Sequence, residues 1–259
     1  MTLIGSRDGP LVVDVRRHEV FAAAPQRIAG AIWRDHMHAA EWYAELGAGR
    51  EIVVYCAHGH NVSEIAATRL AACGARARVL DGGIEAYQQA GGLLVARERP
   101  GVDVAAGASV WVTRQRPKID RIACPWLIRR FIDPLARFHF VASEWVRDVA
   151  EEIGAIPYDV DGVPYSHRGE QCSFDTLIEE FGLKDEALAR LARIVRGADT
   201  ARLDLEPQAA GLLAVSLGLS AIEVDDLRQL EQGMLVYDAL YGWCRFATAE
   251  THNWPARVA

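Results

Sequence analysis

The chain lacks the features that mark several common protein classes. Its five cysteines are odd in number, widely spaced and without a CxxC pair, so neither a disulfide framework nor a cysteine-rich structural zinc site is expected. The longest uncharged apolar stretch, residues 209–222, is shorter than the roughly 20 residues that a membrane span needs. No basic region followed by an apolar run opens the chain, so no secretory signal is predicted. These absences favour the cytoplasm and no membrane partner.

The composition is that of an ordinary globular protein. Hydrophobic residues make up 51% of the chain and charged residues 24%, which excludes a disordered or collagen-like protein. The 259 residues exceed the roughly 100–200 of a typical domain. Two domains are therefore predicted, at residues 1–96 and 109–259, with a linker over residues 97–108 where Pro, Gly and small residues show little periodicity.

The net charge of −7 is unevenly distributed. Residues 1–100 hold 11 basic and 11 acidic side chains, whereas residues 101–259 hold 17 and 24. Within the second part, six basic residues between Arg114 and Arg130 stand against one acid, Asp120. Such a concentrated segment indicates either an anion site or an internal seam of ion pairs. It argues against a broad nucleic-acid-binding face, so no nucleic-acid partner is expected.

Strand and helix patterns alternate in the first domain. Short apolar, β-branched runs predict strands over residues 11–15, 51–56 and 78–80. Apolar residues three to four apart predict helices over residues 37–46, 61–73 and 84–90. This alternation predicts an α/β fold with a parallel sheet and helices on both faces.

The second domain is predicted to be mainly α-helical, an α+β fold. Strands are expected over residues 110–113 and 138–141. Helices are expected over residues 119–131, 143–153, 174–181, 185–196, 207–217 and 224–241.

A cysteine ends the most strongly predicted strand of the first domain. Cys56 is followed by His58, Gly59 and His60 and then by a helix that starts near Asn61. Backbone N–H groups at such a strand–loop–helix junction stabilise a thiolate, a persulfide or an oxyanion. Gly59 permits the tight turn, and the two histidines add titratable groups beside the sulfur. A buried strand-end cysteine is the alternative, but this loop favours a reactive one.

Three segments together resemble a rhodanese domain over residues 7–95: DVRRHEVFAAAPQRIAGAI, VVYCAHGHNVSEIAATRLAACG and VLDGGIEAYQQAG. The resemblance implies a sulfurtransferase in which Cys56 takes sulfane sulfur from a small donor and passes it to an acceptor. His58 and His60 would assist, and Gly59 and Asn61 would contact the substrate. The family's loop carries arginines, including one at the position of Asn61, so weaker binding of a dianion such as thiosulfate is implied.

The second domain offers two groups of candidate ligands. Four basic residues are candidates for holding a tetrahedral oxyanion: Arg114, Arg116, Lys118 and Arg121. Ion pairing with nearby acids is the alternative for them. His167, Glu170 and Cys172 bring imidazole, carboxylate and thiol groups within six residues, which suits zinc or iron. A further ligand would come from a distant acid: Asp199, Glu144 or Asp238. A local hydrogen-bond network is the alternative for this group.

Residues 109–254 resemble the C-terminal domain of the chromate resistance protein ChrB family. Four segments carry the resemblance: WVTRQRPKIDRIACPWLIRRFIDP, HRGEQCSFDTLIEEFGL, LARIVRGAD and YDALYGW. The family is associated with chromate resistance, which implies handling of chromate or a metal. Because a rhodanese-like part occupies the place of the family's regulatory N-terminal part, no DNA-binding role is carried over. Two functions are left: sulfur transfer coupled to oxyanion or metal handling, or a non-enzymatic sensor or accessory protein with a degenerate rhodanese domain. The sequence does not indicate the oligomeric state of the protein.

Overall fold

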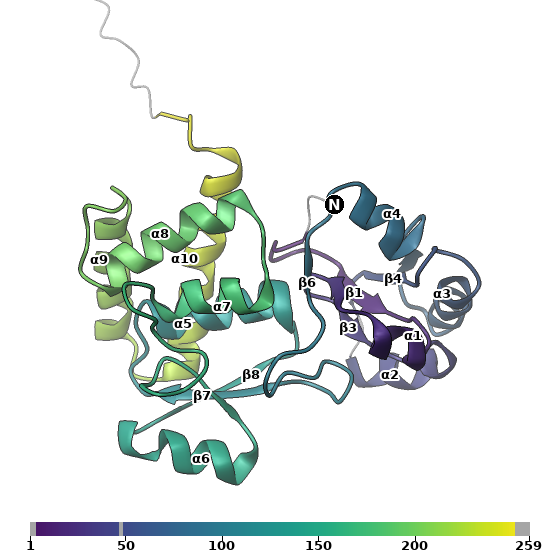
Figure 1. The fold of residues 1–259 in the computed structure, drawn as a ribbon, viewed down its shortest axis with the longest axis horizontal. Coiled ribbons are helices and arrows are strands. Elements are labelled where there is room, and N and C mark those ends of the chain that lie inside the picture. Colours follow the sequence, from purple (N-terminus) through teal and green to yellow (C-terminus); the bar gives the residue numbers. More distant parts are fainter. Residues whose placement is uncertain (1–3, 47–48, 252–259) are drawn as a thin grey trace, which may run out of the picture.

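A computed structural model describes residues 4–46 and 49–251 of the chain. Figure 1 shows two bodies beside each other: a purple-to-blue α/β domain and a teal-to-yellow domain rich in helices. Within the described residues, no helix combines the length and apolar character that crossing a bilayer requires.

The first domain is built on a four-stranded parallel sheet with the order β3-β1-β4-β5. The strands are β1 (Leu11–Asp14), β3 (Ile32–Trp33), β4 (Ile52–Tyr55) and β5 (Ala77–Val79). Successive side chains of a strand point to opposite faces, so each strand serves two cores. Val13 and Val54 pack on one face with helices α2 (Ala39–Leu46) and α3 (Val62–Ala72), whereas Tyr55 packs on the other with α4 (Gly83–Gln89). The predicted α/β fold is confirmed.

Short elements of this domain escape the sequence patterns. They are helix α1 (His18–Ala23), the 3-10 turn His36–His38, and the antiparallel pair of β2 (Gln26–Ile28) with β6 (Leu94–Ala96). Runs of two to six residues are too short to show a period. The predicted linker over residues 97–108 is partly packed, since Val102 and Val104 are buried in the hydrophobic core.

The second domain combines a small parallel sheet with a layer of helices. The sheet has the order β8-β7-β9, with β7 (Val110–Arg114), β8 (Arg137–Val141) and β9 (Ile156–Pro157). The helices are α5 (Asp120–Leu127), α6 (Val146–Ile153), α7 (Ser173–Phe181), α8 (Glu186–Asp199), α9 (Ala209–Ile222) and α10 (Asp226–Phe246). A 3-10 turn, Ser143–Trp145, precedes α6. The mainly helical prediction is confirmed.

Helix α5 contains Pro125 and continues as a π-helical turn over Ile128–Ile132. Proline has no N–H, so the carbonyl of Arg121 loses its helical donor four residues on. The buried hydroxyl of Tyr158 donates to that carbonyl at 3.2 Å. This bond satisfies the carbonyl and ties α5 to the segment that follows β9, where the second site described below is formed.

The two domains share one core. Phe21 and Val95 of the first domain are buried in the same apolar cluster as Phe131 of the second. Arg27 is completely buried and donates to the carbonyl of Ile132 at 2.8 Å, and the N–H of Gly30 donates to the carbonyl of Phe131 at 2.6 Å. The domains are therefore joined by buried backbone hydrogen bonds as well as by apolar contact.

Candidate functional sites

The first candidate site lies at the carboxyl edge of the parallel sheet, where such sheets bind ligands. Cys56 directly follows β4, and the loop after it leads into α3. Gly59 has a φ of +77°, and a Cβ on it would lie 2.7 Å from the carbonyl oxygen of Leu80 and 2.8 Å from the nitrogen of Gly82. The loop therefore packs so tightly on the segment 80–83 that only glycine fits at this position.

Hydrogen bonds to the Cys56 sulfur favour its thiolate form. Burial alone would raise the pKa of this thiol, because the charged form loses solvation. Hydrogen bonds from the Ser63 side chain and from the backbone of His58, Ser63 and Gly59 outweigh that effect, and the pKa is lowered. The hydroxyl of Ser63 lies 3.3 Å from the sulfur. This arrangement increases the fraction of Cys56 that is a nucleophile at neutral pH.

A pocket of about 180 Å³ opens beside Cys56. Its lining includes Arg17, His58 and His60 but no acidic side chain. The neighbouring Arg16 is buried and forms a fork with Asp14, so it serves the structure of the strand end. Arg17, by contrast, is exposed, and its guanidinium forms no hydrogen bond or ion pair with the residues that the structure describes. The pocket is therefore suited to an anionic ligand.

The sequence-predicted residues of this loop have distinct positions. His58 and His60 line the pocket, with the Nδ1 of His58 3.2 Å from a Glu85 carboxylate oxygen. The contact of His60 with Cys56 runs through its carbonyl oxygen, 3.2 Å from the sulfur. Asn61 has a φ of +36° and precedes α3, and its N–H donates to the Glu64 carboxylate. Arg17 is the pocket residue that sequence reasoning missed, because it comes from the loop after β1 rather than from the cysteine loop.

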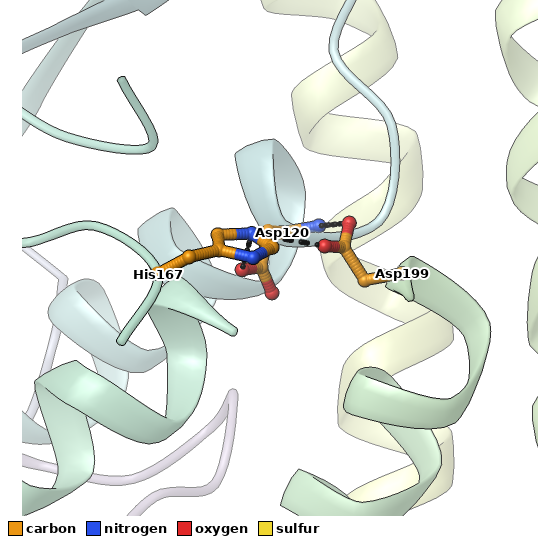
Figure 2. Close-up of side chains that lie close together, drawn as sticks. All are labelled: Asp120, His167 and Asp199. Carbon is orange, nitrogen blue, oxygen red and sulfur yellow. Dashed lines mark hydrogen bonds and ion pairs between the residues drawn. The ribbon is translucent and has the colours of Figure 1, made fainter. Parts of the chain in front are cut away.

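The second candidate site is a cluster of acids around one histidine in the second domain. Figure 2 shows Asp120, His167 and Asp199 pointing toward one another. Asp120 begins α5, Asp199 ends α8, and His167 lies in the segment between β9 and α7. The Nε2 of His167 is 3.1 Å from an Asp199 oxygen and 3.6 Å from an Asp120 oxygen. One ligand atom from each of the three residues lies within 4.8 Å of the others.

A third carboxylate, Asp159, adjoins this cluster. One of its oxygens is 3.5 Å from the His167 Nε2 and accepts a hydrogen bond from the Ser173 hydroxyl at 2.9 Å. The other oxygen accepts from Arg114 at 2.9 Å and lies 3.4 Å from the Nε of Arg121. Protein donors therefore already hold both oxygens of Asp159.

The pKa values of these groups reflect their crowding. The hydrogen bond with Asp159 and the charges of Asp120 and Asp199 outweigh burial and raise the pKa of His167 to about 9. Burial, followed by repulsion from neighbouring acids, raises the pKa of Asp120 and of Asp199. Burial also opposes the charge of Asp159, but hydrogen bonds from His167, Ser173 and Arg114 lower its pKa. The three carboxylates thus favour a positive charge at the position of the His167 imidazole.

Backbone strain is concentrated around the same cluster. Three non-glycine residues there have positive φ angles: Ile119 at +37°, Asp159 at +52° and Ala201 at +57°. Ile119 directly precedes Asp120, and its β-branched side chain makes this conformation costly, about 1–3 kcal/mol. Strain of this kind is concentrated at functional sites in proteins.

The structure does not bring Glu170 and Cys172 into the cluster around His167. The carboxylate of Glu170 pairs with Arg202 at 3.0 Å, and its side chain is 85% exposed. Cys172 is completely buried, its thiol lies 3.3 Å from an Asp175 oxygen, and burial raises its pKa. His167 is instead joined by acids distant in sequence, of which Asp199 was named as a candidate and Asp120 was not.

The basic segment of the second domain is largely a seam of ion pairs. Arg114 and Arg121 face Asp159. Arg116 donates to the carbonyls of Ser220 and Glu223 at the end of α9. Farther along, Arg129 pairs with Glu231 and Arg130 with Asp238. Lys118 is half-buried. The oxyanion role of Arg114, Arg116, Lys118 and Arg121 therefore stays a prediction, and Arg114 and Arg121 are the two that border the acidic cluster.

Comparison with known proteins finds two family matches in the chain. Residues 111–244 match the family described as ChrB, C-terminal domain, and residues 3–90 match the rhodanese-like domain. Protein ChrB of Cupriavidus metallidurans is 38% identical over 133 residues, which cover 51% of this chain and 39% of that protein. The chain thus matches less than half of this relative's length.

Solved structures are similar to the first domain. A rhodanese-like domain from Anabaena sp. is 25% identical, with 33% of this chain and 97% of that chain covered and a TM-score of 0.30. A rhodanese-related protein from Thermoplasma volcanium is 29% identical, with 33% and 82% covered and a TM-score of 0.29. The family match to residues 111–244 covers more than half of the chain. The chain belongs to the ChrB C-terminal domain family and carries a rhodanese-like domain ahead of that domain.

Proposed function

We propose that this chromate-resistance-type protein transfers sulfane sulfur through Cys56, coupled to oxyanion or metal handling by the second domain. The observation that carries the proposal is the Cys56 sulfur itself. Hydrogen bonds with the Ser63 hydroxyl and with the loop backbone lower its pKa, and it borders a pocket with cationic lining. The partners would be a small sulfur donor, a sulfur acceptor and an oxyanion such as chromate. Five free cysteines suit a reducing compartment such as the cytoplasm.

The transfer proceeds in two displacement steps. The Cys56 thiolate attacks the terminal sulfur of a persulfide donor, a sulfur–sulfur bond forms, and the donor's thiolate leaves with the electron pair of the broken bond. An acceptor nucleophile then attacks the outer sulfur of the Cys56 persulfide, and Cys56 leaves as a thiolate. The enzyme is regenerated without any external oxidant or reductant. The hydrogen bonds to Cys56 stabilise the thiolate at the start and at the end of this cycle.

Arg17 supports the binding of an anionic donor. The cysteine loop supplies Asn61 and Ala57 where a cation would otherwise hold the donor's charge. Arg17 reaches the same pocket from the loop after β1, and it has no competing acid among the pocket residues. A guanidinium on one side of the pocket favours a donor with a single anionic group over a dianion that needs charge on several sides.

The alternative is a non-enzymatic metal or oxyanion sensor or accessory protein whose rhodanese domain is degenerate. Two observations favour it: the cysteine loop carries no arginine, and the second domain contains a built cluster of acids around His167. Under this alternative, Cys56 would form no persulfide that turns over.

Sulfur transfer to cyanide separates these two functions. The protein is incubated with a persulfide donor or with thiosulfate, and thiocyanate formation is measured for the wild type, Cys56→Ser and Cys73→Ser. Cys73 is exposed on the helix that follows the loop, so it controls for nonspecific thiol chemistry. We expect turnover in the wild type and Cys73→Ser and none in Cys56→Ser. Equal rates in all three proteins, or no turnover with either donor, would refute the enzymatic proposal.

A further inference from the structure

We propose that Asp120, His167 and Asp199 bind a divalent first-row transition metal ion, with Mn²⁺ and Zn²⁺ as representative ions. The inference deepens the metal-handling part of the proposed function and is independent of sulfur transfer at Cys56. It assigns the ligands to residues from three separate elements: the start of α5, the end of α8 and the segment before α7.

The distances between the donor atoms suit one ion. Ligands about 2.1 Å from a metal lie about 3.0 Å apart at right angles and about 3.4 Å apart in a tetrahedral arrangement. The His167 Nε2 lies 3.1 Å from the Asp199 oxygen and 3.6 Å from the Asp120 oxygen. The two distances from His167 are close to these values, and all three ligand atoms lie within 4.8 Å of one another. Figure 2 shows the three side chains gathered close together.

A buried oxygen of Asp120 lacks a partner and points independently to a ligand. Asp120 is completely buried, and its Oδ1 accepts no hydrogen bond within the described part of the chain. Its Oδ2, the oxygen 3.6 Å from the His167 Nε2, accepts from the backbone N–H groups of Ser173 and Phe174 at the start of α7, which leaves Oδ1 as the oxygen without a donor. A buried carboxylate oxygen without a donor destabilises the fold, and the cost is larger for a charged group than for a neutral one. A metal ion at the cluster offsets this cost.

Charge and access also favour a cation. The carboxylates of Asp120, Asp159 and Asp199 face two guanidinium groups, those of Arg114 and Arg121, and both arginines are directed at Asp159. Within the described residues, neither ligand carboxylate forms an ion pair with an arginine or a lysine. The side chain of His167 is 41% exposed, so an ion can enter from solvent past the imidazole.

The donor set selects a class of metal. Two carboxylates and one imidazole suit Mn²⁺, Fe²⁺ or Zn²⁺, whereas Cu⁺ prefers thiolates. The nearby thiols of Cys124 and Cys172 are completely buried, and neither belongs to the cluster. Three protein ligands leave coordination positions for water or another small ligand, as at reversible or catalytic sites. Asp159 also lies near the cluster, 3.5 Å from the His167 Nε2, and its own oxygens are held by Ser173 and Arg114.

Titration of the full-length, metal-free protein with Mn²⁺ or with Zn²⁺ tests the assignment. Calorimetry gives the stoichiometry and the affinity, and the electron paramagnetic resonance signal of Mn²⁺ reports its immobilisation. We expect one ion per chain, with at least about 100-fold weaker binding in His167→Ala and in Asp199→Asn, because each removes one of three direct ligands. Both side chains lie at the edge of the cluster, and circular dichroism verifies that the variants are folded.

Glu170→Ala is the matched control. Glu170 lies three residues from His167 in the same segment but is exposed and paired with Arg202, so its loss should leave metal affinity unchanged. Equal affinity in the wild type, His167→Ala and Asp199→Asn would overturn the assignment, as would loss of binding in Glu170→Ala. Chromate binding that needs His167 while neither metal binds would show an anion site instead. Thiocyanate formation is also measured for His167→Ala and Asp199→Asn. This assay reports on Cys56 alone, so a failure of the metal assignment can be told apart from a failure of the sulfur-transfer proposal.

Discussion

Replacing Ser63 with alanine should raise the pKa of Cys56 and change its reactivity in a specific way. The Ser63 hydroxyl lies 3.3 Å from the sulfur. Because Ser63 is completely buried, we expect no water to take the place of the hydroxyl in the variant. A hydrogen bond to a charged group contributes about 1.5–3 kcal/mol, and one pKa unit corresponds to about 1.4 kcal/mol. We expect Ser63→Ala to raise the pKa of Cys56 by about 1 unit, the lower end of this range, because the hydroxyl also donates to the His60 carbonyl at 3.3 Å.

The kinetic consequence differs between neutral and alkaline pH. A thiolate with a higher pKa is intrinsically more nucleophilic, with a Brønsted coefficient of about 0.4–0.5. At pH values below the pKa of the wild-type thiol, the thiolate fraction falls about tenfold, and the alkylation rate falls only about threefold because of this compensation. On the alkaline plateau, the variant should react about threefold faster than the wild type. The two pH–rate profiles must therefore cross.

Iodoacetamide alkylation followed across pH measures this effect. The Cys73→Ser background removes the exposed competing thiol; Cys124 and Cys172 are completely buried, and burial raises the pKa of Cys244 to about 11. Thr68→Ala is the control, because that hydroxyl donates to the Glu64 carbonyl of its own helix. Its profile should overlay that of the background protein. A Ser63→Ala profile that also overlays the background would refute the role assigned to the Ser63 hydroxyl.

Three further changes test other contacts. Gly83→Ala places a Cβ 2.4 Å from the Cys56 carbonyl at a φ of +62°, so a lower melting temperature and slower Cys56 alkylation are expected. Arg27→Met removes the donors to the Ala31 and Ile132 carbonyls, and urea unfolding should show a loss of about 3 kcal/mol; an unchanged midpoint would refute the buried link between the domains. Arg17→Ala should raise KM for an anionic sulfur donor several-fold while alkylation by neutral iodoacetamide is unaffected, and an unchanged KM would count against Arg17 as the anion-binding group.

Local sequence patterns predicted the cysteine site because its parts are contiguous. Cys56, Gly59 and the start of α3 follow one another along the chain, so the strand–loop–helix pattern places them together. Arg17 could not be assigned to this pocket in the same way. Its position depends on the parallel pairing of β1 with β4, which brings the two strand ends to one edge of the sheet.

The second cluster shows the limits of local spacing more clearly. His167, Glu170 and Cys172 are close in sequence, yet their side chains point to different partners. Asp120 and Asp199 are joined to His167 by the packing of α5, α7 and α8, which no local pattern encodes. Asp120 is the lone acid of a basic segment, but that pattern predicts neither its burial nor its partners.

The sequence alone allows two interpretations of the basic segment in the second domain: an anion site or an internal seam of ion pairs. The structure shows that long-range acids pair with it, among them Glu231 and Asp238 of α10. Both acids are more than 100 positions from their arginines. Helix periodicity places α10 on the chain but leaves open which helix it packs against.

The most direct test of the central claim is the mass of the Cys56 peptide after brief exposure of the full-length protein to a persulfide donor. The account predicts a gain of about 32 Da, one sulfur atom, on the peptide that contains Cys56, and release of that sulfur when an acceptor thiol is added. Cys56→Ser should show no gain. An unmodified Cys56 peptide at a donor concentration that persulfidates the exposed Cys73 would contradict the claim that Cys56 is the sulfur carrier.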